Sequence, residues 1–267
     1  MKSIYSLYKY KYYLLHFLSL FTTKNSGPNN RCIMYHSIFK NKKIMDDIHI
    51  VEYLNFKKQI GYLKKFNIVP INQINKKKNT ISITFDDGYK DTFKLAYPIL
   101  KKNKIPFAVF VITKNIQEKS KKYLNEEDIK KLSRDKNVII GSHGKNHTDL
   151  TTLNNQMLIE ELKQSKLELE KIIKKKITCF SFPYGKFNQK IIKLSKKLGY
   201  KTLCNSEPCA NNFFNRETAT LNRQAIIYYD NYIFFKNKIN GKLDFIANLK
   251  KILKNLTNNP RSKHGLI

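Results

Sequence analysis

The sequence is poor in acidic residues, histidine and tryptophan. Its 267 residues include 20 Asp and Glu, six His and no Trp, against 51 Lys and Arg. The resulting formal charge of +31 favours anionic partners such as nucleic acid, anionic lipid or an acidic glycan. The basic residues are mostly lysines scattered along the chain, however, and no zinc-finger spacing or RNP-type aromatic strand accompanies them. We therefore expect no specific nucleic-acid partner.

Cysteine is also scarce. The four cysteines, Cys32, Cys179, Cys204 and Cys209, include no C-x2-C pair, which argues against a cysteine zinc site. Cys204 and Cys209 are close enough in sequence to form a disulfide across a loop. Without evidence for one, we expect all four cysteines to be free, mostly buried thiols.

The N-terminal apolar run, from Tyr12 to Phe21, is too short for a comfortable transmembrane span. It has the length of a signal-peptide core, but His16 interrupts it and no small-x-small cleavage site follows. Its tyrosines and the preceding lysines suit a helix that lies at a membrane surface, or one packed on the domain, better than a cleaved signal. We expect peripheral membrane contact through residues 1–23, and a location at the cell envelope or a membrane rather than in the cytoplasm.

From residue 31 onward, strand and helix patterns alternate as in βα units, so the fold class is α/β. The expected strands are 32–35, 67–71, 81–85, 107–112, 137–141, 177–182, 200–204 and 222–228. The expected helices are 52–66, 91–103, 126–134, 154–175 and 188–198. We divide the chain into an apolar, basic N-terminal helix (1–30), a catalytic domain (31–235) and a basic helical tail (236–267).

Two adjacent carboxylates follow the apolar strand pattern that begins at Ile81. Asp86 and Asp87 precede Gly88, which permits a tight turn. Successive side chains of a strand point to opposite faces, so one aspartate can bind a metal while the other handles protons. The alternative is an ordinary strand-end turn, for which Asp-Asp-Gly is common.

Two further segments carry residues suited to hydrolysis. His143 and His147 lie four residues apart after an apolar run, a spacing at which both imidazoles can bind one zinc-like ion. A carboxylate would complete a set that leaves positions open for water and substrate. In Phe182-Pro183-Tyr184-Gly185, a backbone N–H can stabilise an oxyanion, and a plain turn is the alternative.

Together these segments resemble the polysaccharide deacetylase family, carbohydrate esterases with a NodB-homology domain. The segments that carry the resemblance are Thr84–Gly88, Ala96–Leu100, Ile105–Val111, Ser142–His147 and Phe182–Gly185, within residues 31–228. The resemblance implies a distorted (β/α) barrel with fewer than eight strands. It also implies removal of N-acetyl, or sometimes O-acetyl, groups from sugars.

The resemblance assigns roles to individual residues. Asp86 looks like the general base, and Asp87, His143 and His147 look like the ligands of one divalent metal, usually zinc. The loop with Pro183 and Tyr184 looks like the substrate-binding loop, whose backbone N–H contributes to the oxyanion site.

The sequence departs from the family at three positions. Many members have an arginine that pairs with the base where this chain has Ser181, and we expect Arg223 to replace it. Gly144 stands where Ser or Thr is usual, which removes a loop-stabilising hydrogen bond. The late strand around 221–228 lacks the histidine that supplies the general acid in many members.

A tyrosine-histidine pair near the N-terminus offers a replacement for that acid. Tyr35-His36 resembles the opening of a circularly permuted branch that includes the poly-N-acetylglucosamine deacetylases. His36 would then protonate the leaving amine, since a histidine pKa close to neutrality allows it to give and regain a proton. A structural histidine at a strand end is the alternative.

These observations predict a metal-dependent hydrolase that removes acetyl groups from N-acetylated sugars of a polysaccharide or glycan precursor. The first alternative is a catalytically degraded glycan-binding protein on the same scaffold, which metal content and acetate release would separate from the enzyme. The second is a membrane-surface or nucleic-acid binder driven by charge, for which binding without hydrolysis would depend steeply on salt.

Overall fold

The computed structural model describes residues 10, 12–15, 17–22, 30–40, 48–118, 120–208, 210–211 and 220–245. The expected tail beyond residue 245 and Cys209 lie outside the described residues. The expected division at residue 235 falls inside a helix, α8 (Tyr232–Ile239).

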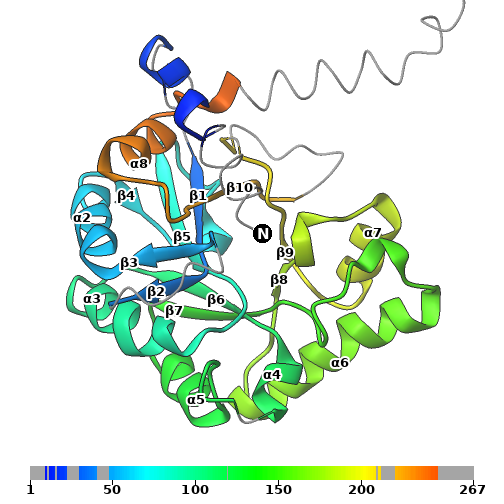
Figure 1. Ribbon diagram of the computed structural model, residues 1–267. Helices are drawn as coiled ribbons and strands as arrows, with labels where there is room; N and C mark the ends of the chain where they lie inside the picture. The colour runs from blue at the N-terminus through cyan, green and yellow to red at the C-terminus, as the bar shows by residue number, and fades with distance from the viewer. Residues whose placement is uncertain are drawn as a thin grey trace, which may run out of the picture.

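Seven parallel strands of the described chain form a nearly closed barrel (Figure 1). In order around the sheet they are β10 (Arg223–Ala225), β1 (Arg31–Tyr35), β5 (Thr80–Phe85), β6 (Phe107–Val111), β7 (Val138–Ser142), β8 (Cys179–Ser181) and β9 (Thr202–Cys204). A short strand, β4 (Asn67–Ile68), pairs with the start of β5. A parallel bridge between Cys204 and Leu221 joins the two ends of the order, with Leu221 N donating to Leu203 O over 2.7 Å.

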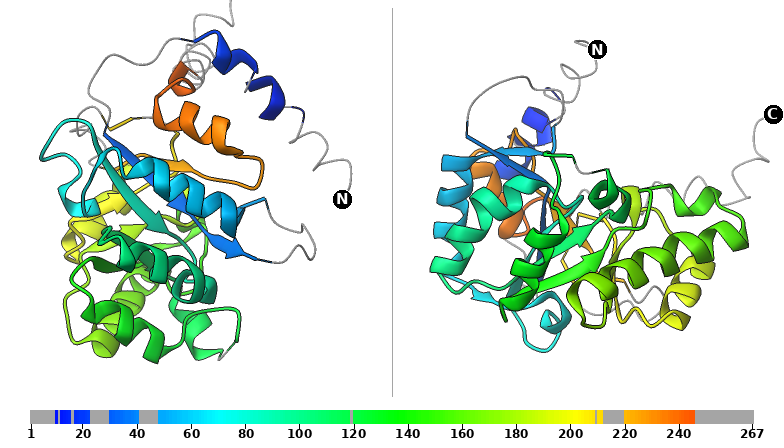
Figure 2. Two further views of the ribbon diagram at one scale, coloured as in Figure 1. Left: turned by 90° about the vertical axis from the view of Figure 1, so that its left-hand side faces the viewer. Right: turned by 90° about the horizontal axis from the view of Figure 1, so that it is seen from below.

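Helices cover the outside of this barrel, as the views in Figures 1 and 2 show. They are α2 (Tyr53–Leu63), α3 (Tyr97–Lys102), α4 (Thr113–Gln117), α5 (Glu126–Arg134), α6 (Asn155–Ile173), α7 (Gln189–Lys197) and α8. Asparagine side chains that precede α5, α6 and α7 accept backbone N–H groups of the first turn, so the Asn-rich composition supplies the helix caps. On α6, Leu158, Leu162 and Leu169 recur at helical spacing and are buried.

The strand alternation divides the core into two parts. One cluster, including Ile33, Ile81 and Val109, packs with residues of the helices. A second cluster combines larger residues such as Phe110 with small side chains from the strands, namely Cys32, Ala108, Cys179 and Cys204. The three described cysteines are buried free thiols, as expected. Small side chains suit a barrel with fewer than eight strands, because its interior is narrow.

The predicted strands and helices are found with small shifts at their ends. The expected helix over 91–103 begins as a π-helical turn (Thr92–Ala96) and continues as α3, and the expected strand over 67–71 is reduced to β4. The sequence interpretation missed the short elements β2 (Ser37–Phe39), β3 (Ile50–Glu52), α4 and α8. The strands β2 and β3 pair with each other outside the barrel sheet.

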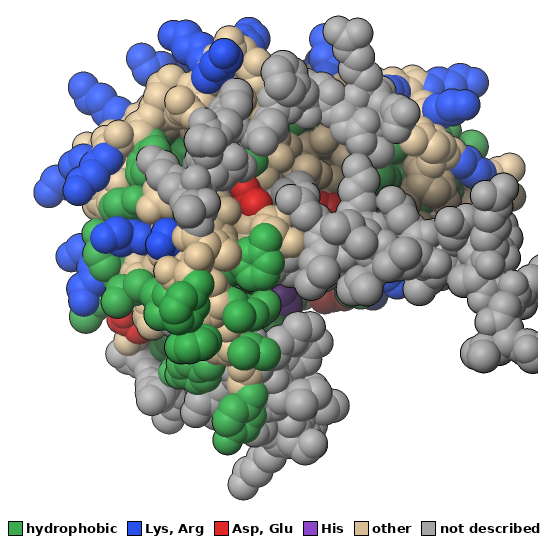
Figure 3. All heavy atoms as spheres, turned by 90° about the horizontal axis from the view of Figure 1, so that it is seen from above, with side chains coloured by type: hydrophobic (Ala, Val, Ile, Leu, Met, Phe, Trp, Pro, Cys, Tyr) green, Lys and Arg blue, Asp and Glu red, His purple; other side chains and the backbone are tan. Residues whose placement is uncertain are grey.

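The N-terminal segment is helical at residues 12–15 and 17–20 and lies beside α8 (Figure 2). None of the described helices is long and apolar enough to cross a membrane. Lysine and arginine side chains are spread over the face seen in Figure 3, in agreement with their scattered distribution in the sequence.

Candidate active site

The residues proposed for chemistry follow the carboxyl ends of the barrel strands. His36 follows β1, Asp86 and Asp87 follow β5, and His143 follows β7. Parallel barrels gather these ends at one mouth, where active sites form. Strained backbone also collects there. Six described residues other than glycine have a left-handed φ, and three of them are Asp87, His147 and Tyr184, as is typical of functional sites.

Asp86 is held by a buried arginine. Arg223 donates from Nη1 to Asp86 Oδ1 over 2.6 Å and from Nη2 to Oδ2 over 2.7 Å. Its remaining donors are also used, by the Asn205 carbonyl and the hydroxyls of Thr84 and Ser181. All five guanidinium N–H groups therefore have acceptors, which compensates for burying the charge. The structure thus places Arg223 against Asp86, the carboxylate with which we expected it to pair.

The charge of this arginine determines the protonation of Asp86. Burial raises the pKa of Asp86, but the charge and hydrogen bonds of Arg223, together with His143 and His36, outweigh burial and hold the pKa below its usual range. Ser181 Oγ adds a hydrogen bond to Asp86 Oδ2 over 3.0 Å. Asp86 is therefore an oriented carboxylate at neutral pH.

The neighbouring residues form the candidate metal site. Oδ1 of Asp87 lies 3.5 Å from Nε2 of His143 and 3.6 Å from Nε2 of His147. One potential ligand atom from each of the three residues lies within 4.8 Å of the other two. A single cation placed between such atoms can bind all three with only small movements.

The protonation of the histidines fits a metal. His143 Nδ1 lies 2.8 Å from the carbonyl oxygen of Ser181, to which it donates, so the lone pair of Nε2 faces Asp87. Burial lowers the pKa of His143 to about 4, against the opposing charge of Asp86, and burial also lowers the pKa of His147. Both rings are therefore neutral, as metal ligands must be.

Glu161 of α6 supports the loop between the two histidines. Its carboxylate accepts from Asn146 N over 2.7 Å and from Asn146 Nδ2 over 2.8 Å. A Cβ at Gly144 would lie 2.8 Å from Glu161 Oε1, and Gly144 has a φ of +81°. The glycine therefore makes room for the carboxylate. The loop is held by this different set of bonds, together with a 3.1 Å bond from Gly144 N to Ser142 Oγ.

His36 lies close enough to the site to interact electrostatically with both Asp86 and His143. Burial lowers the pKa of His36 to about 3, although the charge of Asp86 opposes the shift. The expectation of a pKa close to neutrality is therefore wrong for the resting protein, because desolvation penalises the imidazolium. His36 is neutral before substrate binds.

Two residues that the sequence interpretation did not single out support His36. The ring of His49 lies against it, with a centroid distance of 4.8 Å. Asp91 fixes the following strand, accepting from Ser37 Oγ over 2.5 Å and from Ile38 N over 3.0 Å. Asp91 thereby ties the chain next to His36 to the loop that follows Asp87. The sequence carries no local signal for these contacts.

The third motif forms one wall of the mouth. Pro183 is buried, whereas Tyr184 is exposed and its ring lies 4.6 Å from that of His147. The amides of Gly185 and Lys186 donate to carbonyls within the same loop. Among the amides of this loop, these two are therefore not available to an oxyanion, and Tyr184 N–H remains the candidate donor.

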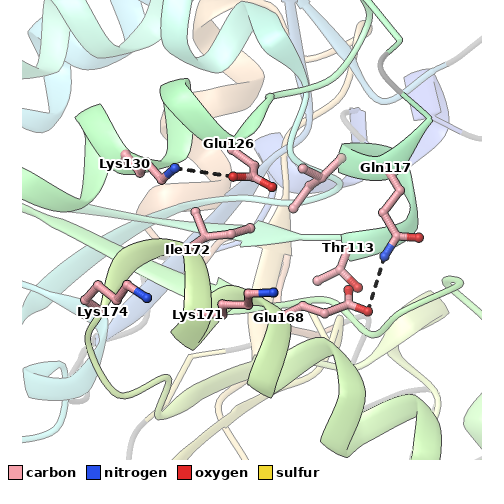
Figure 4. Close-up of a pocket in the computed structure, with 9 residues that line it drawn as sticks. Thr113, Gln117, Glu126, Lys130, Glu168, Lys171, Ile172 and Lys174 are labelled. Atoms are coloured by element: carbon pink, nitrogen blue, oxygen red, sulfur yellow. Dashed lines mark hydrogen bonds and ion pairs between the residues drawn. The ribbon is translucent and has the colours of Figure 1, made fainter.

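A separate pocket lies between α4, α5 and α6 (Figure 4). It has a volume of about 380 Å³ and is lined by residues such as Glu126, Lys130 and Glu168. Its charged groups are partly neutralised by the Lys130–Glu126 ion pair and the Gln117–Glu168 hydrogen bond, both 3.3 Å. No residue proposed for chemistry lines it, so it is not the mouth described above.

Known proteins share these sequence features. The polysaccharide deacetylase family model matches residues 73–203. YxkH of Bacillus subtilis, named for the same family, is 35% identical over 130 residues, which cover 49% of this chain and 46% of that protein. A poly-β-1,6-N-acetyl-D-glucosamine N-deacetylase of Staphylococcus aureus is 29% identical over 174 residues, which cover 57% of this chain and 54% of that protein. The chain thus spans about half the length of the curated relatives it matches.

The fold also has a solved counterpart. Deacetylase PplD of Streptococcus pyogenes superimposes with a TM-score of 0.71 at 22% identity, over 79% of this chain and 99% of that one. At this identity the likeness shows the shared fold. The expected distorted (β/α) barrel of the NodB-homology type is confirmed.

Proposed function

Because residues 73–203 match the polysaccharide deacetylase family model, we propose that this protein removes acetyl groups from N-acetylated sugars of a polysaccharide or glycan precursor. The observation that carries the proposal is one barrel mouth that combines a two-histidine, one-carboxylate set with a separate, arginine-held carboxylate. This division of labour between Asp86 and Asp87 is what hydrolysis of an amide requires. We further propose that the substrate lies at the cell envelope.

One divalent cation, which we propose to be zinc, would be held by Asp87, His143 and His147. When bound, it supplies Lewis acidity to the acetyl carbonyl and the attacking water. Neutral imidazoles and an aspartate carboxyl group are ligand types that zinc prefers. Ser181 orients the His143 ring for this task through its carbonyl oxygen.

Asp86 takes the proton of the attacking water. Its Oδ2 accepts from both Arg223 and Ser181, whereas its Oδ1 accepts from Arg223 in the described part of the chain. Oδ1 therefore keeps a lone pair, whereas Oδ2 is the oxygen that lies 3.7 Å from Nε2 of His143. We assign the carboxylate, without choosing between its oxygens, as the acceptor of the water proton. Because Arg223 fixes the carboxylate from behind, no reorientation is needed when the water binds.

The acetyl oxygen gains negative charge as water adds, and we assign Tyr184 N–H as the backbone donor that stabilises it. The amine must leave with an added proton. Since His36 is neutral in the resting site, the proton it delivers has to be the one removed from water, passed on from Asp86. Asp91 and His49 position His36 for this transfer.

Acetate release from a panel of N-acetylated glycans, with and without chelator, tests the proposal. We expect release from at least one glycan, loss of activity in chelator, and recovery when about one equivalent of zinc is returned. A metal-loaded protein that binds a glycan but releases no acetate from any member of the panel would favour the degraded, glycan-binding alternative instead.

A further inference from the structure

The N-terminal helical segment turns polar groups toward the barrel. Tyr12 OH donates to Asp230 Oδ1 over 3.2 Å and also accepts from Lys238 Nζ. Ser19 Oγ accepts from Asn237 Nδ2 over 3.0 Å, and Thr22 Oγ1 donates to the carbonyl of Lys242 over 2.8 Å. These contacts hold the segment against α8 and the residues that flank it.

The opposite face of the segment is apolar and exposed. Large hydrophobic side chains recur there at helical spacing and are 40–74% exposed, namely Tyr10, Tyr13, Leu14, Phe17, Leu18 and Phe21. Tyr232 and Ile233 of α8 are exposed as well. An ordinary surface helix buries its apolar stripe against the core and exposes its polar face. The N-terminal segment does the reverse. An inverted stripe needs an apolar partner outside the described fold.

Charge indicates which partner this is. A second copy of a chain with a net charge of +31 would be repelled, and a nucleic acid would not cover an apolar stripe. The interface of an anionic bilayer offers both an apolar layer and negative headgroups. Seen from above, hydrophobic side chains gather in one area, with lysines and arginines to its left and above it (Figure 3).

A groove next to the stripe carries the charged groups for such a surface. It has a volume of about 590 Å³, and its lining includes Tyr13 and Tyr232. Its charged residues are Lys40, Lys58 and Glu52, so positive charge prevails. Tyrosine and lysine side chains have an apolar body and a polar tip. They therefore suit the headgroup region of a bilayer, which lies between the apolar layer and water. The groove thus places cationic groups beside the exposed apolar stripe.

We propose that the N-terminal segment docks the enzyme on an anionic lipid surface, lying in the interface with its outward stripe embedded. This goes beyond the deacetylase activity, which needs only the barrel mouth. The short helix enters the headgroup boundary without spanning the bilayer.

Co-sedimentation of the full chain with vesicles tests the docking. One set of vesicles is phosphatidylcholine, and the other contains about one third phosphatidylglycerol. The variant replaces Leu14, Phe17 and Phe21 by serine. We expect wild-type protein to bind the anionic vesicles, and the triple variant to bind them roughly 100-fold more weakly, since three large apolar side chains no longer enter the interface.

The matched control replaces three exposed apolar residues of α6, Met157, Ile159 and Leu167, by serine. It should bind as wild type does, and both triple variants should release acetate from a soluble oligosaccharide at the wild-type rate. Equal binding of wild type and the Leu14, Phe17 and Phe21 variant would overturn the proposal, because lysine charge alone would then suffice. A concentration-dependent dimer that only this variant loses would overturn it in favour of a second copy.

Discussion

The two sides of the barrel mouth differ in their access to solvent. On the metal side, the side chains of Asp87 and His147 are 16% and 26% exposed, although that of His143 is only 3% exposed. On the proton side, the side chains of Asp86 and Arg223 are 3% and 0% exposed. The metal side is built from turns with left-handed backbone, and the proton side from a buried ion pair. An entering ion and substrate need access, while a base that must stay ionised inside a barrel needs a fixed countercharge.

Replacing the proposed metal ligands should reduce acetate release the most. We expect wild-type protein to hold about one zinc ion per chain, and the double variant His143→Ala, His147→Ala to lose it together with all measurable acetate release. Metal analysis after gel filtration checks this. Full occupancy in the double variant would show that the ligands were assigned wrongly.

Replacing only the proposed base, Asp86, should reduce turnover without removing the metal. Asp86→Asn keeps the shape of the carboxylate but cannot accept the water proton. Turnover should therefore fall by about 100-fold or more while the zinc content stays close to wild type. If Asp86→Asn instead lost the metal and kept residual turnover, the roles of the two aspartates would have to be exchanged.

His36→Ala tests whether the N-terminal strand contributes the missing acid. We expect a fall in turnover of roughly 10- to 100-fold, with zinc content and thermal unfolding almost unchanged. His264→Ala serves as the control, because His264 is the histidine that follows His147 in the sequence. Unchanged turnover in His36→Ala would remove His36 from the mechanism.

Glu161→Gln should have the smallest effect, and this effect should be confined to zinc affinity. The amide oxygen can still accept from one donor of Asn146, but the charge that holds the loop is lost. Zinc affinity should fall by about 10-fold, within the range found for residues that support metal ligands, and added zinc should restore turnover. A loss of turnover that saturating zinc does not restore would place Glu161 on the proton side instead.

The sequence interpretation succeeded where the information is local. Strand and helix periodicity located the barrel elements, and the pairs Asp86-Asp87 and His143–His147 are short motifs whose chemistry is readable from spacing. It failed for short elements such as β2, β3 and α4, which are only three to five residues long and have no periodicity of their own. It also missed the burial of His36, which depends on segments distant in sequence.

The sequence by itself determined the order of the βα units and the residues that can bind a metal or move a proton, because both follow from neighbouring side chains. Only the tertiary structure decided their partners. Arg223 reaches Asp86 across 137 positions because β10 pairs with β1, which in turn pairs with β5. The same packing turned the apolar stripe of the N-terminal segment outward, since α8 and its flanking residues offer polar groups that satisfy the other face.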